Sequence, residues 1–373
     1  MKSILHVIGT RPEAVKMAPI ILELRRHANR CRSLVCVTGQ HRRMLDQVLE
    51  LFQIEPDFDL NLMRPNQTLG ALTSRLFERL TDLVERVKPD WIVAQGDTTT
   101  VFVAGMVAFY QRIRFAHVEA GLRTGDRTQP FPEEINRRIA DLIADLYFAP
   151  TTRARDALLA EGCRREDILV TGNTVVDAVL DVARRPFDWQ HSALRKIPRD
   201  GRIVLITAHR RENFGRPFCN VCTAISRLAQ SFADDGVHFV YPVHLNPNTR
   251  GPALRLLGGR KNLTLLEPLD YQSLVQVMMH SSLILTDSGG IQEEAPAFGV
   301  PVLVLRNTTE RPEGVDAGVA RLVGTSPRRI VVEATRVLRA LPVQRLPLAD
   351  NPYGDGRAAR RIVSALLKGT AIR

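Results

Sequence analysis

The sequence predicts an α/β protein with two Rossmann-like domains, each built on a doubly wound parallel sheet. Short apolar runs alternate along the chain with longer helical patterns, which is the rhythm of consecutive βα units. The chain has 373 residues, more than a single core usually serves, so two domains are expected. Its composition, 45% hydrophobic and 24% charged, is that of an ordinary globular protein.

The first half contains short apolar runs that suit buried strands, each followed by a helical or polar segment. Pro12 lies near the start of the first helix, where a missing N–H costs little. A later helix carries leucines at helical spacing and ends before Pro89. The expected strands are 3–8, 34–37, 91–94, 114–118, 146–149 and 168–170, and helices are expected at 11–27, from 42 onward and at 66–86.

The second half repeats this rhythm after a connection. Residues 184–202 contain two prolines and a glycine among charges, which is typical of a link between domains with at most a short helix. Further proline and glycine at 341–356 precede a basic helix at 357–367. We expect domains at 1–172 and 173–356, with strands of the second at 203–207, 239–244, 263–266, 283–285 and 301–305.

Asp97 and Glu119 each follow a predicted strand of the first half. In a doubly wound sheet the carboxyl ends of the strands border the crevice where ligands bind, so both carboxylates are candidate site residues. Asp97 also suits the N-cap of the next helix, with Thr98 to Thr100 as further capping groups. Both interpretations of Asp97 stay open.

A third carboxylate, Glu133, opens a helical segment after Pro132, where an ordinary acidic residue of a first turn is the alternative. Arg11 and Lys16 follow the first strand and can both reach one anion, although surface charges are the alternative. One such loop would mean little, but three acidic loops in one half indicate a site.

The stretch 283–297 predicts a strand, a tight turn and a helix start. Gly289 and Gly290, after Ser288, let backbone N–H groups approach a ligand, and a helix N-terminus favours phosphate. Glu293 and Glu294 then stand where a carboxylate can hold ribose hydroxyls. The alternative is an ordinary strand-to-helix loop with acidic residues in its first turn.

His209 and Arg210 follow the strand at 203–207 and suit a leaving phosphate, because histidine gives or takes a proton near neutral pH. A packed, hydrogen-bonded histidine is the alternative. Arg311 supplies a cation in another strand-end loop, at 306–313.

The net charge of +11 raises the possibility of nucleic acid or an acidic membrane surface. However, the basic residues are scattered without a long tract, so nucleic acid is not an expected partner. The longest apolar runs, such as 300–305, fall short of the ~18 residues that span a bilayer, so no membrane association is expected.

An odd number of cysteines, five, without a signal peptide, predicts a reduced, cytoplasmic setting. Cys219 and Cys222 have the spacing of half a zinc or redox site. The sequence has no second pair of cysteines at that spacing, so we expect a structural pair and no metal. The chain lacks a Walker loop and, after its first strand, the Gly-x-Gly-x-x-Gly signature. A nucleotide-sugar therefore fits better than a dinucleotide cofactor.

Seven motifs together carry a specific resemblance. The chain resembles the bacterial non-hydrolysing UDP-N-acetylglucosamine 2-epimerases, which have the two-domain GT-B architecture of many glycosyltransferases. The likeness covers nearly the whole chain, and the motifs occur in the order of that family. They lie at 9–19, 95–100, 117–124, 130–137, 209–215, 287–294 and 308–313.

The resemblance implies a role for each group of residues and an enzyme without a cofactor. It also implies a homodimer and a terminal helix, within 357–373, that packs on the first domain. Positions implicated in the sugar and its chemistry match Arg11, Lys16, Asp97, Glu119, Glu133 and His209, and those that hold UDP match Ser288, Gly289, Gly290, Glu294 and Arg311. Many relatives bind a second, activating substrate molecule at positions that match Gln40, Glu134, Arg210 and His244, while Arg43 and Asn66 depart from that pattern.

The implied reaction interconverts UDP-N-acetylglucosamine and UDP-N-acetylmannosamine by loss and return of UDP through 2-acetamidoglucal. Three alternatives remain. A GT-B glycosyltransferase would need a sugar acceptor and no carboxylate trio, and a hydrolysing epimerase would release free N-acetylmannosamine. A catalytically idle nucleotide-sugar sensor is disfavoured by the joint presence of Asp97, Glu119, Glu133 and His209.

Overall fold

The structure is a computed structural model that describes residues 1–39, 42–64, 67–340 and 347–368. The chain forms two compact units. The first comprises Met1–Ala178 together with the segment from Gly356 onward, and the second is Val179–Asp355. The division falls inside helix α7 (Thr174–Ala183). The domain limits expected at 172 and 356 stay a prediction.

The first unit is built on a seven-stranded sheet whose strands all run parallel. Its order is β3-β2-β1-β4-β5-β6-β7, so the sheet extends in opposite directions from the β1–β4 pair. This reversal is the topological switch point of a doubly wound sheet. The strands are β1 (Lys2–Ile8), β2 (Cys31–Val37), β3 (Phe58–Asp59), β4 (Trp91–Gln95), β5 (Arg114–Val118), β6 (Leu146–Ala149) and β7 (Ile168–Val170).

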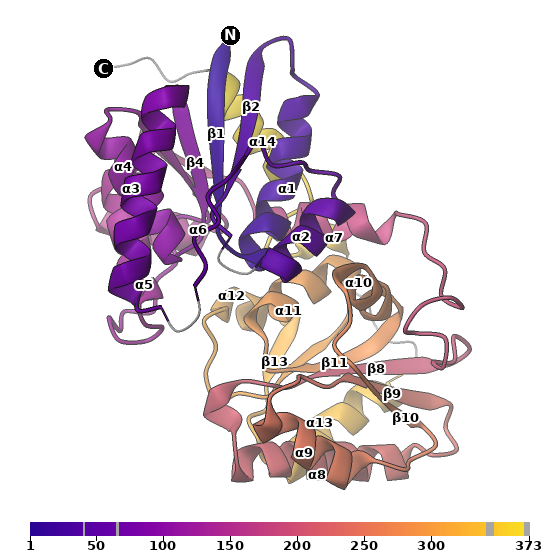
Figure 1. The fold of residues 1–373 in the computed structure, drawn as a ribbon. Helices are drawn as coiled ribbons and strands as arrows, with labels where there is room; N and C mark the ends of the chain where they lie inside the picture. The colour runs from indigo at the N-terminus through magenta and orange to yellow at the C-terminus, as the bar shows by residue number, and fades with distance from the viewer. Residues whose placement is uncertain (40–41, 65–66, 341–346, 369–373) are drawn as a thin grey trace. The chain divides into compact units, whose positions relative to one another are not determined.

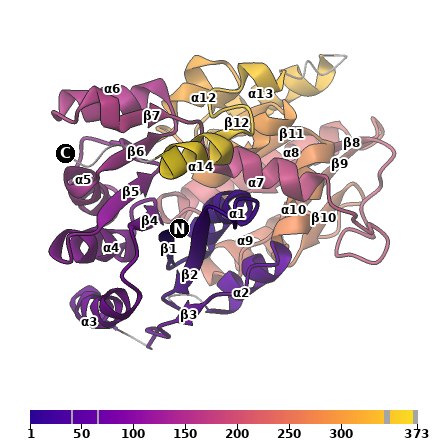
Figure 2. The same ribbon diagram turned by 90° about the horizontal axis from the view of Figure 1, so that it is seen from above.

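Helices cover both faces of this sheet (Figures 1 and 2). Leucines of α3 (Leu69–Val87) pack with apolar residues of α4 (Thr99–Tyr110) and of the sheet in one core. Helix α5 (Glu133–Ile143) lies beside α4, and α1 (Arg11–Arg25) covers the opposite face. The remaining helices are α2 (Arg42–Leu51), α6 (Thr152–Ala160) and α14 (Ala358–Lys368).

The terminal helix α14 packs on α1 of the first unit. Asp177 receives hydrogen bonds from the backbone N–H groups of Ala358 (3.1 Å) and Ala359 (2.9 Å), which satisfies donors that every helix N-terminus leaves free. At the other end, Lys2 donates to the carbonyl of Leu366 at 3.0 Å. A basic group there complements the negative end of the helix dipole.

The second unit has a six-stranded parallel sheet in the order β10-β9-β8-β11-β12-β13, with its switch point between β8 and β11. Apolar residues of α8 (Arg216–Ser231), α9 (Pro247–Leu257) and α13 (Pro327–Arg339) share one core with the sheet. The other elements are α10 (Tyr271–His280), α11 (Gly289–Glu294), α12 (Pro312–Asp316), β8 (Arg202–Thr207), β9 (Val237–Pro242), β10 (Leu263–Leu266), β11 (Ser281–Thr286), β12 (Val302–Val304) and β13 (Ala320–Leu322).

The predicted fold class is confirmed, and the differences lie at the ends of elements. Helix α3 begins at Leu69 rather than 66, because Thr68 caps it by accepting a hydrogen bond from Ala71 N at 3.2 Å. The strand expected at 239–244 is β9, which starts two residues earlier and ends at Pro242. The short strands β3 (Phe-Asp) and β13 (Ala-Arg-Leu) were not predicted, because each contains a charged residue and neither forms an apolar run like that of the similarly short β7. Among the described helices, none combines the length and apolar character that a membrane crossing requires.

Candidate functional site

Several of the predicted site residues lie at the switch points of the two sheets. In the first unit, Gly9 follows β1 and Asp97 follows β4, and these strands are neighbours. In the second unit, His209 follows β8 and Ser288 follows β11, which are again neighbours. The carboxyl ends of such strands diverge and leave room for a ligand. Gly9 is required there, since a Cβ would lie 2.3 Å from Thr100 Oγ1.

Glu119 is a carboxylate of the first unit that several side chains hold in place. Its side chain is 8% exposed and pairs with the Lys16 ammonium group, which reaches it from α1. The side-chain amides of Gln95 and Asn173 also donate to its oxygens, the latter at 3.1 Å. The backbone of Glu119 is left-handed, with φ of +67°, a conformation that few residues other than glycine adopt. Such an unfavourable backbone is typical of functional positions.

Asp97 is held by helix α5. The Asn136 amide donates to the backbone carbonyl of Asp97 at 3.0 Å, and the Arg137 guanidinium pairs with its carboxylate, whose side chain is 30% exposed. Glu133 lies one turn before these residues on the same helical face, half-buried. One face of α5 therefore carries Glu133 and holds Asp97, two of the three predicted carboxylates.

Glu13 is a buried carboxylate that the sequence analysis did not single out. It is 2% exposed, and its side chain accepts hydrogen bonds from the backbone N–H groups of Gly9 and Thr10. Burial raises its pKa to about 7, against the opposing effect of those hydrogen bonds. The Arg-Pro-Glu sequence after the first strand carried a signal, because an acid three residues after Thr10 forms a capping box. Arg11, at the first position of α1, is half-buried.

We expect Glu13 to make the protein less stable as the pH rises from about 4.5 to about 7. The unfolded chain loses this proton near the ordinary pKa of 4.5, whereas the folded chain keeps it until the pKa of about 7. The stabilisation is thus complete below the lower value and lost through the higher one, a change of about 3 kcal/mol. Urea unfolding measured at several pH values in this range should show that the free energy of unfolding of the wild type falls relative to that of Glu13→Gln. If the unfolding free energies of the two proteins changed equally with pH, the assignment would be contradicted.

Asp287 organises the loops of the second unit. It is fully buried, and its carboxylate accepts hydrogen bonds from the backbone N–H groups of His209 (2.9 Å) and Arg210 (2.9 Å) and from the Asn213 amide (3.1 Å). The loop after β8 is therefore fastened to the end of β11. The sequence analysis placed Asp287 in a motif but gave it no role, because its partners lie more than seventy residues away.

His209 lies in a half-exposed position between charged and aromatic groups. Its Nδ1 is 3.7 Å from Asp287 Oδ1, and its ring stacks on His244 with centroids 5.3 Å apart. Burial lowers the pKa of His209, with His244 and Arg210 acting in the same direction and Asp287 against them. The neutral ring therefore predominates near neutral pH, so His209 is available as a hydrogen-bond donor and proton acceptor.

The Ser288–Gly290 turn is bordered by two cations. A Cβ at Gly289 would lie 3.4 Å from Arg210 Nη2 and 4.0 Å from Arg311 Nη2, ordinary contact distances. Arg311 is itself oriented by an ion pair with the buried Glu293. Backbone N–H groups at a helix start together with two guanidinium groups suit a phosphate.

The remaining predicted residues differ in what surrounds them. Glu294 is buried and accepts a hydrogen bond from Tyr271 at 3.2 Å. Glu134 is 1% exposed, binds the backbone N–H of Thr124 at 3.1 Å and pairs with Arg137. Gln40, Asn66 and the side chain of Arg43 lie outside the described residues. The activating site stays a prediction.

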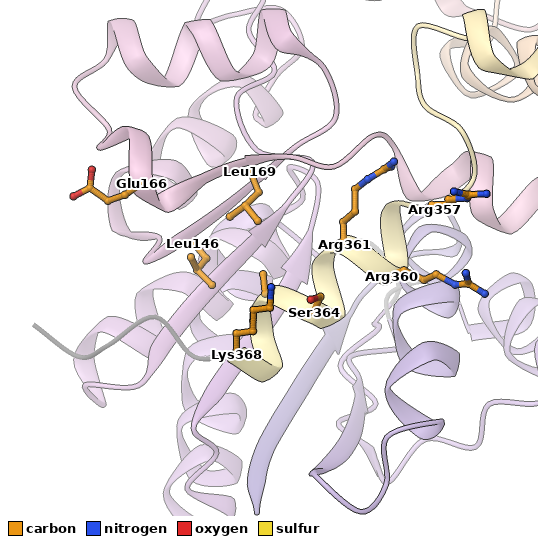
Figure 3. A pocket seen from close by; sticks show the side chains of 9 residues that line it. Leu146, Glu166, Leu169, Arg357, Arg360, Arg361, Ser364 and Lys368 are labelled. Carbon is orange, nitrogen blue, oxygen red and sulfur yellow. The ribbon is translucent and has the colours of Figure 1, made fainter.

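A pocket of about 730 Å³ in the first unit lies away from these loops. Its lining includes Leu146, at the start of β6, and the exposed face of α14. The charged ends of its basic side chains, from Arg357, Arg360, Arg361 and Lys368, spread around the helix rather than converge (Figure 3). It therefore lacks the arrangement that would hold an anion. Among the described residues, no cluster of three His, Cys, Asp or Glu could hold a metal ion.

Two doubly wound sheets in tandem, with acidic groups at one switch point and cations at the other, define a GT-B-type protein. The chain belongs to the UDP-N-acetylglucosamine 2-epimerase family, whose model matches residues 23–367. A UDP-N-acetylglucosamine 2-epimerase of Escherichia coli (strain K12) is 50% identical over 370 residues, which covers 97% of this chain and 98% of that protein.

Solved structures of similar proteins agree with this placement. A putative UDP-N-acetylglucosamine 2-epimerase from Listeria monocytogenes has a TM-score of 0.90 and 44% identity, covering 98% of this chain and 96% of its own. The UDP-GlcNAc 2-epimerase from Neisseria meningitidis, bound to UDP-GlcNAc, has a TM-score of 0.87 and 46% identity, covering 98% of this chain and all of its own.

Proposed function

We propose that the protein is a non-hydrolysing UDP-N-acetylglucosamine 2-epimerase that acts without a cofactor. The observation that carries the proposal is the arrangement of Glu119, whose carboxylate is held by Lys16, Gln95 and Asn173 at the carboxyl edge of the first sheet. Family membership supports the substrate class, and the Neisseria relative is described as bound to UDP-GlcNAc. Product would supply surface-polysaccharide synthesis in the cytoplasm.

The proposed chemistry begins with cleavage of the bond between the anomeric carbon and the oxygen of UDP. The electron pair leaves with UDP, and positive charge at the anomeric carbon acidifies the neighbouring C–H. A carboxylate removes that proton, which gives 2-acetamidoglucal. UDP then adds back to the anomeric carbon while a proton reaches the second carbon from the opposite face. No oxidant is consumed, and UDP and the sugar both return to the product. The hydrogen removed from the second carbon is replaced by one that has exchanged with solvent.

The predicted residues of each unit have a proposed role. Asp97, Glu119 and Glu133 are the proposed acid–base groups, with Lys16 paired to Glu119 and Arg11 on the same helix, α1. In the second unit, Ser288, Gly289, Gly290 and Arg311 are proposed to hold the diphosphate, Glu294 the ribose, and His209 the leaving group. Preorganised donors around a developing charge stabilise the transition state by roughly 3 kcal/mol each.

The proposal predicts incorporation of solvent deuterium at the second carbon of the sugar. Purified protein is incubated with UDP-N-acetylglucosamine in heavy water and followed by NMR. We expect an equilibrium mixture of the two nucleotide-sugar epimers, with deuterium in the earliest product because that proton exchanges with solvent during elimination. Early product without deuterium would count against elimination.

The same spectra separate the alternatives. Free N-acetylmannosamine with UDP would identify a hydrolysing epimerase. An unchanged substrate would favour a glycosyltransferase that lacks its acceptor, or a protein that only binds the ligand. Oxygen-isotope exchange tests bond cleavage directly. The label moves between the oxygen that joins the sugar to the β-phosphorus and the non-bridging oxygens of the β-phosphate only if UDP detaches and returns.

We also propose that the protein is a homodimer that pairs through its first unit. Large apolar side chains are exposed on the adjacent helices α4 and α5: Phe109 is 63%, Tyr110 64% and Leu142 84% exposed. Exposed large apolar groups on two neighbouring helices support an interface at these helices. Analytical ultracentrifugation should give a dimer for the wild type and a monomer for Leu142→Glu. Val332→Glu, at an exposed valine of the second unit, is the matched control and should remain dimeric.

A further inference from the structure

A buried network of charged side chains contacts the strand-end loops of the first unit. His117, in β5, is fully buried two residues before Glu119. Its Nδ1 is 2.6 Å from Asp141 Oδ1, and its Nε2 is 2.7 Å from the backbone carbonyl oxygen of Gly96. A carbonyl oxygen and an ionised carboxylate can only accept hydrogen bonds. Both ring nitrogens must therefore donate, which makes the ring an imidazolium.

The surroundings of His117 favour this charged form. Burial alone lowers its pKa, but the charge and hydrogen bond of Asp141 and the Gly96 carbonyl outweigh burial and raise it. Asp141, 1% exposed, also accepts a hydrogen bond from Gly121 N at 3.1 Å and pairs with Arg123 at 2.7 Å. Burial raises the pKa of Asp141, but His117 and Arg123 outweigh it and hold the carboxylate ionised.

The other titratable groups near His117 and Asp141 do not change the charges of this pair at neutral pH. Arg123 is also paired with Glu161 at 2.6 Å, and hydrogen bonding to Arg123 lowers the pKa of Glu161. Burial raises the pKa values of Tyr147 and Cys163, which face Asp141, so both stay uncharged. One cationic ring and one carboxylate thus remain at the centre, with a second ion pair behind them.

Gly96 connects the His117–Asp141 pair to the site. Gly96 has a φ of +87° and precedes Asp97 directly, so the direction of its carbonyl group helps to set the path of the chain into Asp97. Asn136 holds the next carbonyl, that of Asp97, and Arg137 holds the carboxylate. These residues and Asp141 all belong to α5. One helix therefore fixes both the Asp97 turn and the ring of His117.

We propose that His117 is a positioning residue, held as an imidazolium by Asp141, which fixes the Gly96 carbonyl and so aligns Asp97 with Glu119. This inference rests on the proposed epimerisation. It assigns His117 no contact with substrate, since the ring is fully buried.

His6 provides a matched control in the same sheet. It is also fully buried, in β1, but its Nε2 contacts an uncharged hydroxyl, Ser33 Oγ at 3.1 Å. Burial lowers its pKa to about 3, so this ring is neutral. Replacing either histidine removes a buried ring from a central strand, and only His117 is linked to the turn at Gly96.

The first test compares His117→Asn with His6→Asn, and measures kcat per folded molecule and the Kd for UDP. We expect kcat of His117→Asn to fall about 10²-fold, the size of effect that a shift of about 1 Å in a catalytic group produces. UDP affinity should not change. His6→Asn should lose stability but keep kcat. Equal kcat for the two variants would overturn the proposal.

The second test needs no activity and no variant that must fold. In protein labelled with ¹⁵N-histidine, NMR near pH 7 should show both ring nitrogens of His117 protonated and those of His6 in a neutral ring. A single ring proton on His117 would overturn the inference. If the wild type did not epimerise while both ring protons were present, the proposed function would fail but the charge assignment would stand.

Discussion

Glu119→Gln is expected to lower kcat by about 10³-fold, within the range that general acid–base catalysis contributes. The amide keeps the size of the side chain but cannot take up the proton of the sugar. Its NH₂ group is also a hydrogen-bond donor and would face another donor in either orientation, because Lys16 donates to one oxygen of Glu119 and Gln95 to the other. Initial rates of epimer formation, followed by NMR, measure the loss.

A UDP-binding measurement and a control variant separate an effect on catalysis from an effect on binding. UDP affinity of Glu119→Gln should match the wild type, because the groups proposed to hold UDP all belong to the second unit. Glu55→Gln, at an exposed carboxylate of the first unit, should keep full activity. A Glu119→Gln protein that epimerises nearly as fast as the Glu55→Gln control would show that Glu119 takes no part in proton transfer.

Asp287→Ala is expected to lower the free energy of unfolding by about 4 kcal/mol, because it leaves several buried donors unpaired at roughly 1–3 kcal/mol each. The donors are the backbone N–H groups of His209 and Arg210 and the amide of Asn213, all now facing the carboxylate. The loop that carries His209 should lose its anchor as well, so kcat should fall even in the folded fraction. Urea unfolding and steady-state rates measure the two effects.

Asp234→Ala is the control for this experiment, since Asp234 is an exposed aspartate of the same unit. Its unfolding free energy should stay within about 0.5 kcal/mol of the wild type, as is usual for surface substitutions. If Asp287→Ala were as stable as Asp234→Ala, the network around Asp287 would not hold the loop after β8.

Much of the fold could be predicted because the apolar runs are local signals. The apolar runs match each of the long strands to within a few residues, and Asp97, Glu119 and His209 each follow the end of one of these strands. The strands that escaped prediction, β3 and β13, contain a charged residue each and form no apolar run. The start of α3 shifted to Leu69 because a single cap, Thr68, decides where a helix begins.

The sequence by itself determined the order of βα units and, through it, which polar residues stand at the carboxyl edges of the two sheets. Only the tertiary structure decided their partners. The contacts of Glu119 with Lys16 and Asn173 span 103 and 54 residues, and Asp287 reaches back 78 residues to His209. Such contacts depend on strand register and on how each helix packs across the sheet, which a local pattern does not encode. Burial also depends on everything packed around a residue, and it raises the pKa of Glu13. The pairing of His117 with Asp141 likewise joins two residues that lie 24 positions apart in the sequence.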